Sequence, residues 1–497
     1  RPAPPPPPGA RAPRAPAGPP RGGGGGPRPA ADVRRVFGLQ QGELYSSEEI
    51  ELSRLALLDL GVFASVEVEP DLSQIERTRT VPLTVRTEPA KLRALLAGFG
   101  FQFDALKTDV HTMVGWQSAN FLGGLRRFEV RFKPGIVLYP TRLPDVQAPE
   151  KLLGEQRLIA TLRQPAFLER RTAGVARAEY NIYPILLPGS LDPENLAGYH
   201  EVRAELGLER SFGRVFASPQ YGAQANFPFD YLGTNAELQP LFISYAELFS
   251  YLDLRNDPVR PRRGLFVGAE LQTAGGPLQG DADDLRVQPE LRGFVPLLRR
   301  VTLAMRASVG FLFPRNYGGA ARAAARGSSF EIDENLARDY QLLFFRGFFG
   351  GGPSSNRGYP LRGIGPHALI PRASPAGQSI AAAGCAPEAT FCTLPTGGQS
   401  MWEANVEARV VVAGPFSTAF FCDAGDVSPY PVNIRLERLH LSCGTGARYD
   451  TPVGPVRLDI GYRIPGLQFP EGARGELVPR PLLGLPVVLS FGIGEAF

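Results

Sequence analysis

A long series of strand-like segments, running from Leu92 to the end of the chain, sets the strongest limit on the fold. About sixteen segments alternate in polarity or are rich in β-branched and aromatic residues, and no helix signal interrupts them. They are 92–103, 110–118, 125–137, 156–165, 173–186, 199–211, 214–228, 238–253, 263–273, 284–295, 299–313, 401–413, 416–424, 438–449, 455–464 and 487–497. Tight and long connections alternate over most of the series, as in an up-and-down barrel of an outer membrane. We therefore predict a mainly β fold, a 16-stranded antiparallel transmembrane β-barrel over residues 91–497.

The two faces of the later strands differ in polarity. Along 401–413, Glu403, Asn405, Glu407 and Arg409 share one side, and the other side is apolar. A polar lumen and an apolar lipid face explain charges that recur with period two on long strands. Alternation alone does not separate a membrane barrel from a soluble one. The number and length of the strands and the terminal Phe497 favour the membrane.

Two further regions precede the barrel. Residues 1–31 are rich in Pro, Gly, Ala and Arg, which predicts a disordered tail or linker. Residues 32–90 predict a small α/β module, with a helix that begins after Ser46, carries Glu49 as the capping-box partner and stops at Gly61. Two short strands, 62–69 and 81–88, complete the module.

Composition excludes several classes of function. Residues 1–35 hold seven Arg and one Asp, and without them the net charge falls from +4 to about −2, which argues against a broadly basic nucleic-acid surface. No apolar run is long enough to predict a transmembrane helix. The sequence lacks zinc-protease, serine-hydrolase and phosphate-loop motifs, and its four His and four Cys have no metal-ligand spacing. We expect no enzymatic activity, no metal and no cofactor.

The longest gap between predicted strands, 314–400, contains a segment of unusual composition. Residues 344–366, FFRGFFGGGPSSNRGYPLRGIGP, carry too much Gly and Pro for a strand and too many aromatic residues for a disordered linker. We expect a long ordered loop that inserts into the barrel lumen. Arg357 on this loop needs a carboxylate, because burying an unpaired guanidinium is costly. The lumen-facing candidates are Asp423, Glu407 and Glu403.

Four stretches together resemble the outer-membrane assembly superfamily that includes BamA, TamA and the two-partner secretion transporters. GELYSSEEIELSRLALLDLGVFASVEVEP resembles the later part of a POTRA module, and SNRGYP resembles the family's (V/I)RG(F/Y) loop element. FFCDAGDV and GTGARYDTPVGPVRLDIGY resemble the strands that follow, and NDPVRPRRG adds to the likeness. The chain departs from the family in two places: the first POTRA strand is replaced by Pro/Gly-rich sequence, and Asn356 stands where Val or Ile is usual.

The resemblance implies roles for particular residues. It implies that Arg357, Gly358 and Tyr359 tether the loop inside the barrel, with Asp423 as the first partner of the Arg and Glu407 as the second. It also implies that the seam between the first and last strands is a lateral gate. Gly98 and Gly100 would loosen one side of that gate. Phe491, Gly494 and Phe497 lie in a C-terminal strand that looks like the signal by which barrel proteins are recognised.

The four cysteines allow two disulfides. Cys385 and Cys392 lie in the long loop with six residues between them, a spacing that permits a bond in an oxidising compartment. Cys422 and Cys443 fall on lipid-facing positions of predicted neighbouring strands. They either form a cross-strand bond or serve as apolar side chains.

The resemblance implies a protein of the outer membrane of a Gram-negative-type bacterium, with its POTRA-like module in the periplasm. The expected function is insertion of β-barrel or autotransporter-type proteins into that membrane through the lateral seam. The expected partners are unfolded outer-membrane clients, outer-membrane lipid and other periplasmic or inner-membrane assembly proteins, with no nucleic acid. The alternatives are a two-partner secretion transporter, which exports a specific protein, and a passive porin-like channel.

Overall fold

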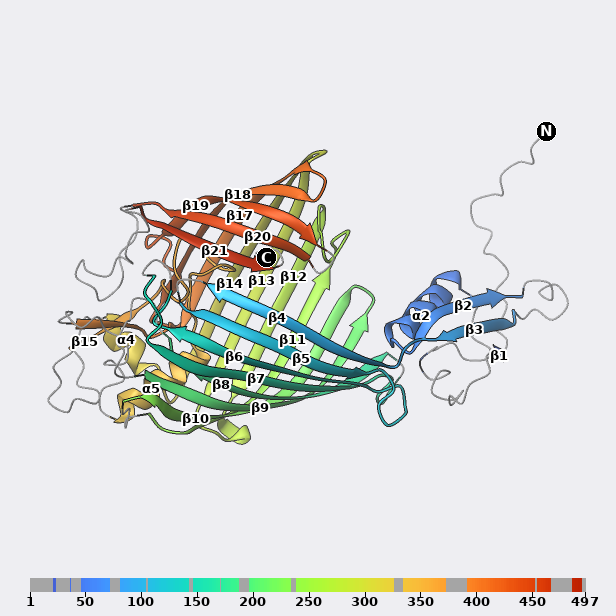
Figure 1. The fold of residues 1–497 in the computed structure, drawn as a ribbon, viewed down its shortest axis with the longest axis horizontal. Coiled ribbons are helices and arrows are strands. Elements are labelled where there is room, and N and C mark those ends of the chain that lie inside the picture. The colour runs from blue at the N-terminus through green and yellow to red at the C-terminus, as the bar shows by residue number, and fades with distance from the viewer. Residues whose placement is uncertain are drawn as a thin grey trace.

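Sixteen strands form one antiparallel sheet in the computed structural model, and each pairs with the next strand of that sheet along the chain (Figure 1). The structure describes residues 21–23, 36, 46–71, 81–103, 106–142, 146–169, 171–186, 196–233, 238–325, 334–371, 391–451, 454–465 and 485–493. The strands are β4 (Arg93–Phe103), β5 (Thr108–Ser118), β6 (Arg127–Tyr139), β7 (Lys151–Gln164), β8 (Thr172–Pro184), β9 (Leu196–Phe212), β10 (Val215–Leu232), β11 (Leu241–Asp253), β12 (Gly264–Ala274), β13 (Asp284–Leu298), β14 (Val301–Pro314), β17 (Ser400–Ala413), β18 (Phe416–Ser428), β19 (His440–Thr451), β20 (Gly454–Arg463) and β21 (Val487–Ile493). The predicted barrel is confirmed, strand for strand.

The two faces of the barrel have the polarity that the sequence predicts. On β17 the inward Glu403, Asn405 and Glu407 are buried, whereas the outward Val406 is 47% exposed. On β20 the inward Asp459 has no exposed surface. Within the described residues, no helix is long and apolar enough to cross a membrane.

A small α/β module lies beyond the end of the barrel where β4 begins (Figure 1). Helix α2 (Ser47–Asp59) starts at Ser46, whose side chain accepts a hydrogen bond from the Glu49 N–H, and ends before Gly61, which has a φ of +66°. Strands β2 (Phe63–Pro70) and β3 (Leu83–Pro89) follow as predicted. The core of the module includes Leu57 and Val62 and continues into Ala119 and Leu125, in the turn between β5 and β6.

The prediction of disorder throughout residues 1–31 is wrong for three residues. Strand β1 (Arg21–Gly23) pairs parallel with β3 and gives the sheet order β1-β3-β2. Glycine lacks a side chain, so Gly22 and Gly23 join the sheet edge through backbone groups alone. Strand β1 thereby takes the place of the strand that a POTRA module has ahead of its first helix.

The connection between β14 and β17 contains helices that the sequence analysis missed. It holds α4 (Gly319–Ala325), α5 (Glu334–Arg346) and the hairpin of β15 (His367–Pro371) and β16 (Phe391–Pro395). A short 3-10 helix, η2 (Gly276–Leu278), lies in the loop after β12. Helix α5 buries Ala337, Leu342 and Leu343 in a core shared with β11, β14 and β17. These elements gather at the end of the barrel opposite the α/β module (Figure 1).

Candidate functional site

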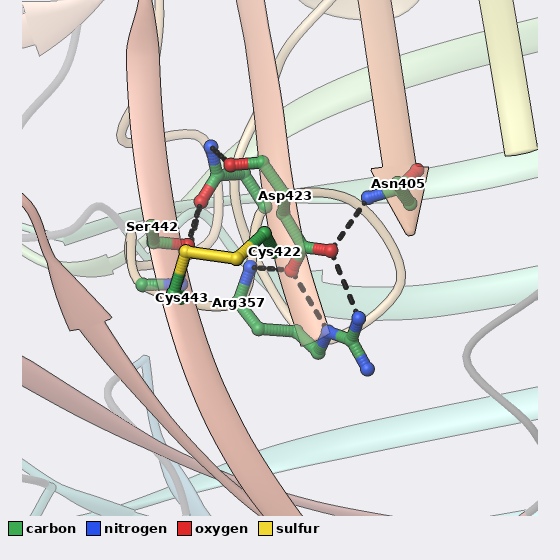
Figure 2. Close-up of a disulfide and its surroundings, with 8 residues drawn as sticks. Arg357, Asn405, Cys422, Asp423, Ser442 and Cys443 are labelled. Atoms are coloured by element: carbon green, nitrogen blue, oxygen red, sulfur yellow. Dashed lines mark hydrogen bonds and ion pairs between the residues drawn. A yellow bond between two sulfur atoms is a disulfide. The ribbon is translucent and has the colours of Figure 1, made fainter. Parts of the chain in front are cut away.

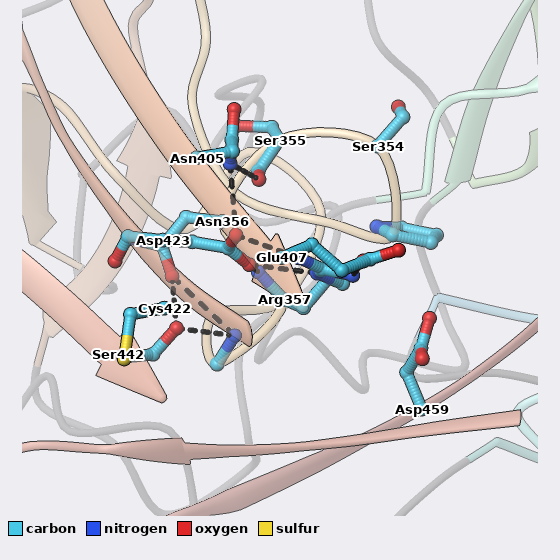
Figure 3. A network of polar contacts seen from close by, with 12 residues as sticks. Ser354, Ser355, Asn356, Arg357, Asn405, Glu407, Cys422, Asp423, Ser442 and Asp459 are labelled. Carbon is cyan, nitrogen blue, oxygen red and sulfur yellow. Dashed lines mark hydrogen bonds and ion pairs between the residues drawn. The ribbon is translucent and has the colours of Figure 1, made fainter. Parts of the chain in front are cut away.

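The loop that follows α5 folds back against the inner face of β17, β18 and β19 (Figure 3). Gly351 and Gly352 have φ values of +94° and +100°, which glycine adopts without strain. The loop closes through the Gly352 N–H, which donates to the Tyr359 carbonyl at 3.0 Å. The Tyr359 N–H in turn donates to the Asn356 carbonyl at 3.1 Å. This tight turn presents Arg357 to the barrel wall.

Arg357 is 1% exposed and binds Asp423 and Glu407, the first- and second-ranked partners of the sequence analysis. Its Nε and Nη2 donate to the two carboxylate oxygens of Asp423 at 2.8 Å each, and its backbone N–H donates to Oδ2 at 3.0 Å. Its Nη1 donates to Oε2 of Glu407 at 2.5 Å. The guanidinium carbon lies 3.5 Å from the ring centroid of Phe421. A planar fork makes this bidentate contact, which a lysine ammonium cannot reproduce.

Further charged side chains surround Arg357 and its two carboxylates, and each carboxylate of this cluster has an Arg partner. Glu407 also accepts a hydrogen bond from Arg409 at 2.9 Å and lies 3.6 Å from Arg448. Arg448 reaches Asp459 at 2.5 Å. Such a network holds charges that would otherwise be costly to bury. Among the residues that the structure describes, no group of three His, Cys, Asp or Glu side chains is placed to hold a metal ion.

Asn356, which departs from the family pattern, makes its own contacts with the wall. Its Nδ2 donates to the backbone carbonyls of His440 at 2.9 Å and Asp423 at 3.3 Å. Its Oδ1 accepts from the Ser442 hydroxyl at 2.6 Å, and that hydroxyl also accepts from the Gly358 N–H at 3.1 Å. The side chain therefore bridges backbone groups of β18 and β19, which an apolar residue cannot do.

Two glycines allow the loop to approach the strands this closely. A Cβ atom on Gly358 would lie 2.2 Å from the Cβ atom of Ser442. A Cβ atom on Gly461 would lie 2.4 Å from the Arg357 carbonyl oxygen. Tyr359 is 3% exposed, and its ring lies 5.5 Å from the His440 ring. The sequence analysis did not single out Ser442 or Gly461, because their importance depends on contacts between distant segments.

Glu403 is the one candidate partner that does not contact Arg357. It pairs with Arg306 at 3.1 Å and accepts a hydrogen bond from the Ser355 hydroxyl. Asn405, one position further along the inner face, donates to Asp423 at 2.9 Å. The expectation that Glu403 serves Arg357 is therefore wrong, since the Glu403 carboxylate pairs with Arg306 of the neighbouring strand β14.

A second buried ion pair anchors the start of the loop, at the C-terminal end of α5. Arg346, the last residue of α5, donates to the two oxygens of Asp284 at 2.6 and 3.0 Å. The Tyr317 hydroxyl donates to the same carboxylate at 2.7 Å. The sequence analysis missed this anchor because it did not predict α5. The loop is thus fixed to the wall at both ends, at Arg346 and at Arg357.

The seam lies between β4 and β21, and the described residues of these two strands form no ladder with each other. Gly98 and Gly100 stand on β4, where a Cβ atom on Gly100 would lie 2.1 Å from Nε2 of His111 on β5. Gly100 therefore makes room for the His111 ring. Phe491 on β21 is 60% exposed. Gly494 and Phe497 lie outside the described residues.

Cys422 and Cys443 form a disulfide between directly opposed positions of β18 and β19 (Figure 2). Asp423 follows Cys422 and Ser442 precedes Cys443, so the two residues that contact the loop form the next opposed pair in the ladder. The other expected bond cannot be followed, because Cys385 and the side chain of Cys392 lie outside what the structure describes.

Two family models match the chain. The Omp85 superfamily domain matches residues 222–497, and the POTRA model, described as a surface antigen variable number repeat, matches residues 29–90. No curated protein sequence matches the chain.

Several solved structures share the fold at low sequence identity. BamA from Haemophilus ducreyi lacking POTRA domains 1–3 is 14% identical, with 90% of this chain and 80% of that chain covered and a TM-score of 0.58. CdiB from Acinetobacter baumannii is 12% identical, with 93% and 72% covered and a TM-score of 0.57. CdiB from Escherichia coli is 12% identical, with 90% and 72% covered and a TM-score of 0.51.

Proposed function

Because the chain belongs to the Omp85 superfamily, we propose that it inserts β-barrel or autotransporter-type proteins into the bacterial outer membrane through the seam between β4 and β21. Family membership supports a general role in insertion or translocation at that membrane, with the POTRA module in the periplasm. The proposal adds the direction of transfer, from the periplasm sideways into the bilayer. Unfolded barrel proteins and outer-membrane lipid are the partners it requires.

The observation that carries the proposal is the outer edge of β4, which pairs with no other strand in the described part of the chain. An edge strand presents a row of free N–H and C=O groups, which a client strand can pair with. On β4 the apolar side chains of Leu95, Phe99 and Phe101 are 81%, 75% and 57% exposed. An incoming strand that pairs with this edge would also extend the apolar outer face.

The docked loop holds together β17, β18 and β19, the strands on the C-terminal side of the seam. Arg357 ties β17 and β18 together through Glu407 and Asp423, and Asn356 ties β18 to β19. The described part of strand β21, Val487–Ile493, pairs only with β20 among the described residues. The C-terminal side of the seam therefore has a firm base in β17–β19, and in this proposal β21 separates from β4 while those strands stay in place. A short strand at the seam would also thin the bilayer locally and lower the barrier to insertion.

The α/β module is suited to hold a client before insertion. The order β1-β3-β2 leaves one side of β2 unpaired within the described part of the sheet, so an extended client segment can add there. The free energy for insertion would come from the folding of the client itself, since the chain carries no nucleotide-binding motif.

Depletion of the protein tests the proposal. Outer-membrane barrel proteins should fall together in the depleted cells, as measured by quantitative proteomics of outer-membrane fractions. Loss of a single exported protein with the other barrels unchanged would identify a secretion transporter instead. Ion conductance in planar bilayers with no effect of depletion on other proteins would identify a passive channel.

A variant links this function to the loop. Arg357→Ala should fail to restore barrel protein levels in the depleted cells, although it still reaches the membrane. Full complementation by Arg357→Ala would show that the docked loop has no part in the function.

A further inference from the structure

The Cys422–Cys443 disulfide lies on the outer, lipid-facing side of the barrel. Its neighbours in register are Val406 on β17 and Tyr462 on β20, which are 47% and 39% exposed on the same face. Phe420, one outward position away on β18, is 57% exposed. In the membrane, these exposed apolar groups face lipid chains, so the disulfide lies in an apolar surface.

The position along β18 places the bond within the hydrocarbon layer. Cys422 stands six residues from Phe416 at one end of the strand and four from Asp426 near the other. At about 3.4 Å per residue these separations are roughly 20 and 14 Å along the strand. With strands tilted by about 40°, both ends of an apolar band about 25 Å tall lie roughly 10 to 15 Å away. The bond is near the middle of that band.

The lumen side of the same site is closed. Asp423 and Ser442 follow and precede the two cysteines, point inward, and have no exposed surface. They are covered by Asn356 and Arg357 of the docked loop (Figures 2 and 3). In the folded protein, a water-soluble reagent therefore meets lipid on one side of the cysteines and the buried loop contact on the other.

Disulfide formation needs conditions that this site does not offer after insertion. The reacting species is the thiolate, which must reach the disulfide of an oxidant. An ionised group is costly in hydrocarbon. We infer that the Cys422–Cys443 bond forms before β18 and β19 enter the bilayer, by exchange with a periplasmic dithiol–disulfide oxidant.

The exchange is balanced in two steps. The thiolate of one cysteine attacks the oxidant's disulfide, forms a mixed disulfide and releases one oxidant thiolate. The thiolate of the second cysteine then attacks the mixed disulfide, which forms the Cys422–Cys443 bond and releases the oxidant as a dithiol. Two electrons pass to the oxidant, and the two thiol protons pass to water or to the released thiolates.

This order of events has a structural consequence. Because Cys422 and Cys443 are directly opposed in the ladder, their bond in the periplasm brings β18 and β19 into native register before insertion. Asp423 and Ser442, the two residues that receive the loop, are then already side by side. The inference depends on the barrel lying in a membrane and not on which clients it inserts.

A pulse-chase experiment in cells tests the order. Protein with Cys385→Ser and Cys392→Ser is labelled briefly, quenched with acid and alkylated with a mass-adding maleimide, and insertion is followed by heat-modifiable mobility. We expect the oxidised form to appear in the unfolded pool first, and the inserted form to contain no free thiols at any time. An inserted form that carries free thiols and oxidises later would overturn the inference.

A matched pair on the same strands provides the control in vitro. Phe416 and Tyr449 are directly opposed on the same face, six residues from the cysteines and next to the periplasmic turn. Reduced protein is refolded into phospholipid vesicles and treated with oxidised glutathione. The native pair should oxidise at least about tenfold more slowly than F416C/Y449C in a C422S/C443S background, since each 1.4 kcal/mol of thiolate desolvation lowers its population tenfold. Equal rates would refute the inference. If reduced protein does not insert, the measurement in cells decides.

Discussion

Replacing Gly358 by Ala would test how closely the loop must approach the barrel wall. The new methyl group would lie 2.2 Å from the Cβ atom and 2.7 Å from the hydroxyl oxygen of Ser442. Carbon atoms normally stay about 3.5–4.0 Å apart. Both Cβ atoms are attached directly to backbone, so a rotamer change cannot relieve the contact. The loop must therefore move away from β19 by about 1.3 Å or more, so that the 2.2 Å separation reaches about 3.5 Å.

The expected loss of stability has two parts. Overpacking alone costs about 1–3 kcal/mol. A shift of this size also lengthens the bonds from Arg357 to Asp423, and a buried pair that loses its partner costs about 3–5 kcal/mol. We expect Gly358→Ala to lower the unfolding free energy of the barrel by about 3 kcal/mol or more. Urea unfolding in detergent micelles, followed by heat-modifiable mobility, measures the change.

Ser442→Gly should rescue the alanine variant. It removes both clashing atoms, and the next atom near the new methyl is the Arg463 amide nitrogen at 3.5 Å. Alone, Ser442→Gly removes two hydrogen bonds, to Asn356 and from Gly358, which contribute about 1 kcal/mol each. The double variant should therefore match Ser442→Gly, so the coupling energy in the double-mutant cycle should equal the full cost of Gly358→Ala, about 3 kcal/mol. A neutral Gly358→Ala variant, or a double variant less stable than both single ones, would refute the reasoning.

Three other substitutions test the remaining contacts by the same unfolding measurement. Arg357→Lys keeps the charge but loses the bidentate fork on Asp423, so we expect a loss of about 2 kcal/mol; unchanged stability would mean that charge alone holds the loop. Asn356→Val restores the usual family residue but removes the hydrogen bonds that join Asn356 to the His440 and Asp423 carbonyls and to the Ser442 hydroxyl, at about 1–3 kcal/mol, and a stabilised variant would contradict this. Arg346→Met leaves Asp284 buried without its cation, at about 3–5 kcal/mol, and Asp284→Asn in the same background should recover part of that loss.

The barrel strands could be predicted because each carries its signal locally. Apolar residues such as Val406 and Phe420 recur at every second position along their strands, and this period decides which side of the strand faces lipid. The tight turns, such as 414–415 between β17 and β18, mark the ends of strands without any knowledge of the partner. The number and order of the strands therefore follow from short windows of sequence, whereas their exact ends, such as the start of β7 at Lys151, do not.

The loop contact could be predicted only in part. Arg357 and Asp423 stand out because a buried charge requires an opposite charge. Ser442 and Asn356 do not stand out, because a hydroxyl or an amide has many equally good partners. Glu403 was assigned to the wrong Arg, since Arg306 competes for it from β14. Helix α5 was missed because its apolar residues are Phe and Leu next to a Gly-rich stretch, which obscured the helical period.

The hydrophobic core shared by the α/β module and the β5–β6 turn couples movement of the module to the first strands of the barrel. Ala119 and Leu125, in the turn after β5, pack in the same core as Leu57 and Val62, and the chain runs from the module directly into β4. A tilt of the module would therefore apply force first to β4 and β5, the two strands at that end of the sheet. The disulfide-linked strands β18 and β19 lie near the other end of the strand order. Under the proposed function, a client that pulls on the module would transmit that force to the edge where its own first strand would pair.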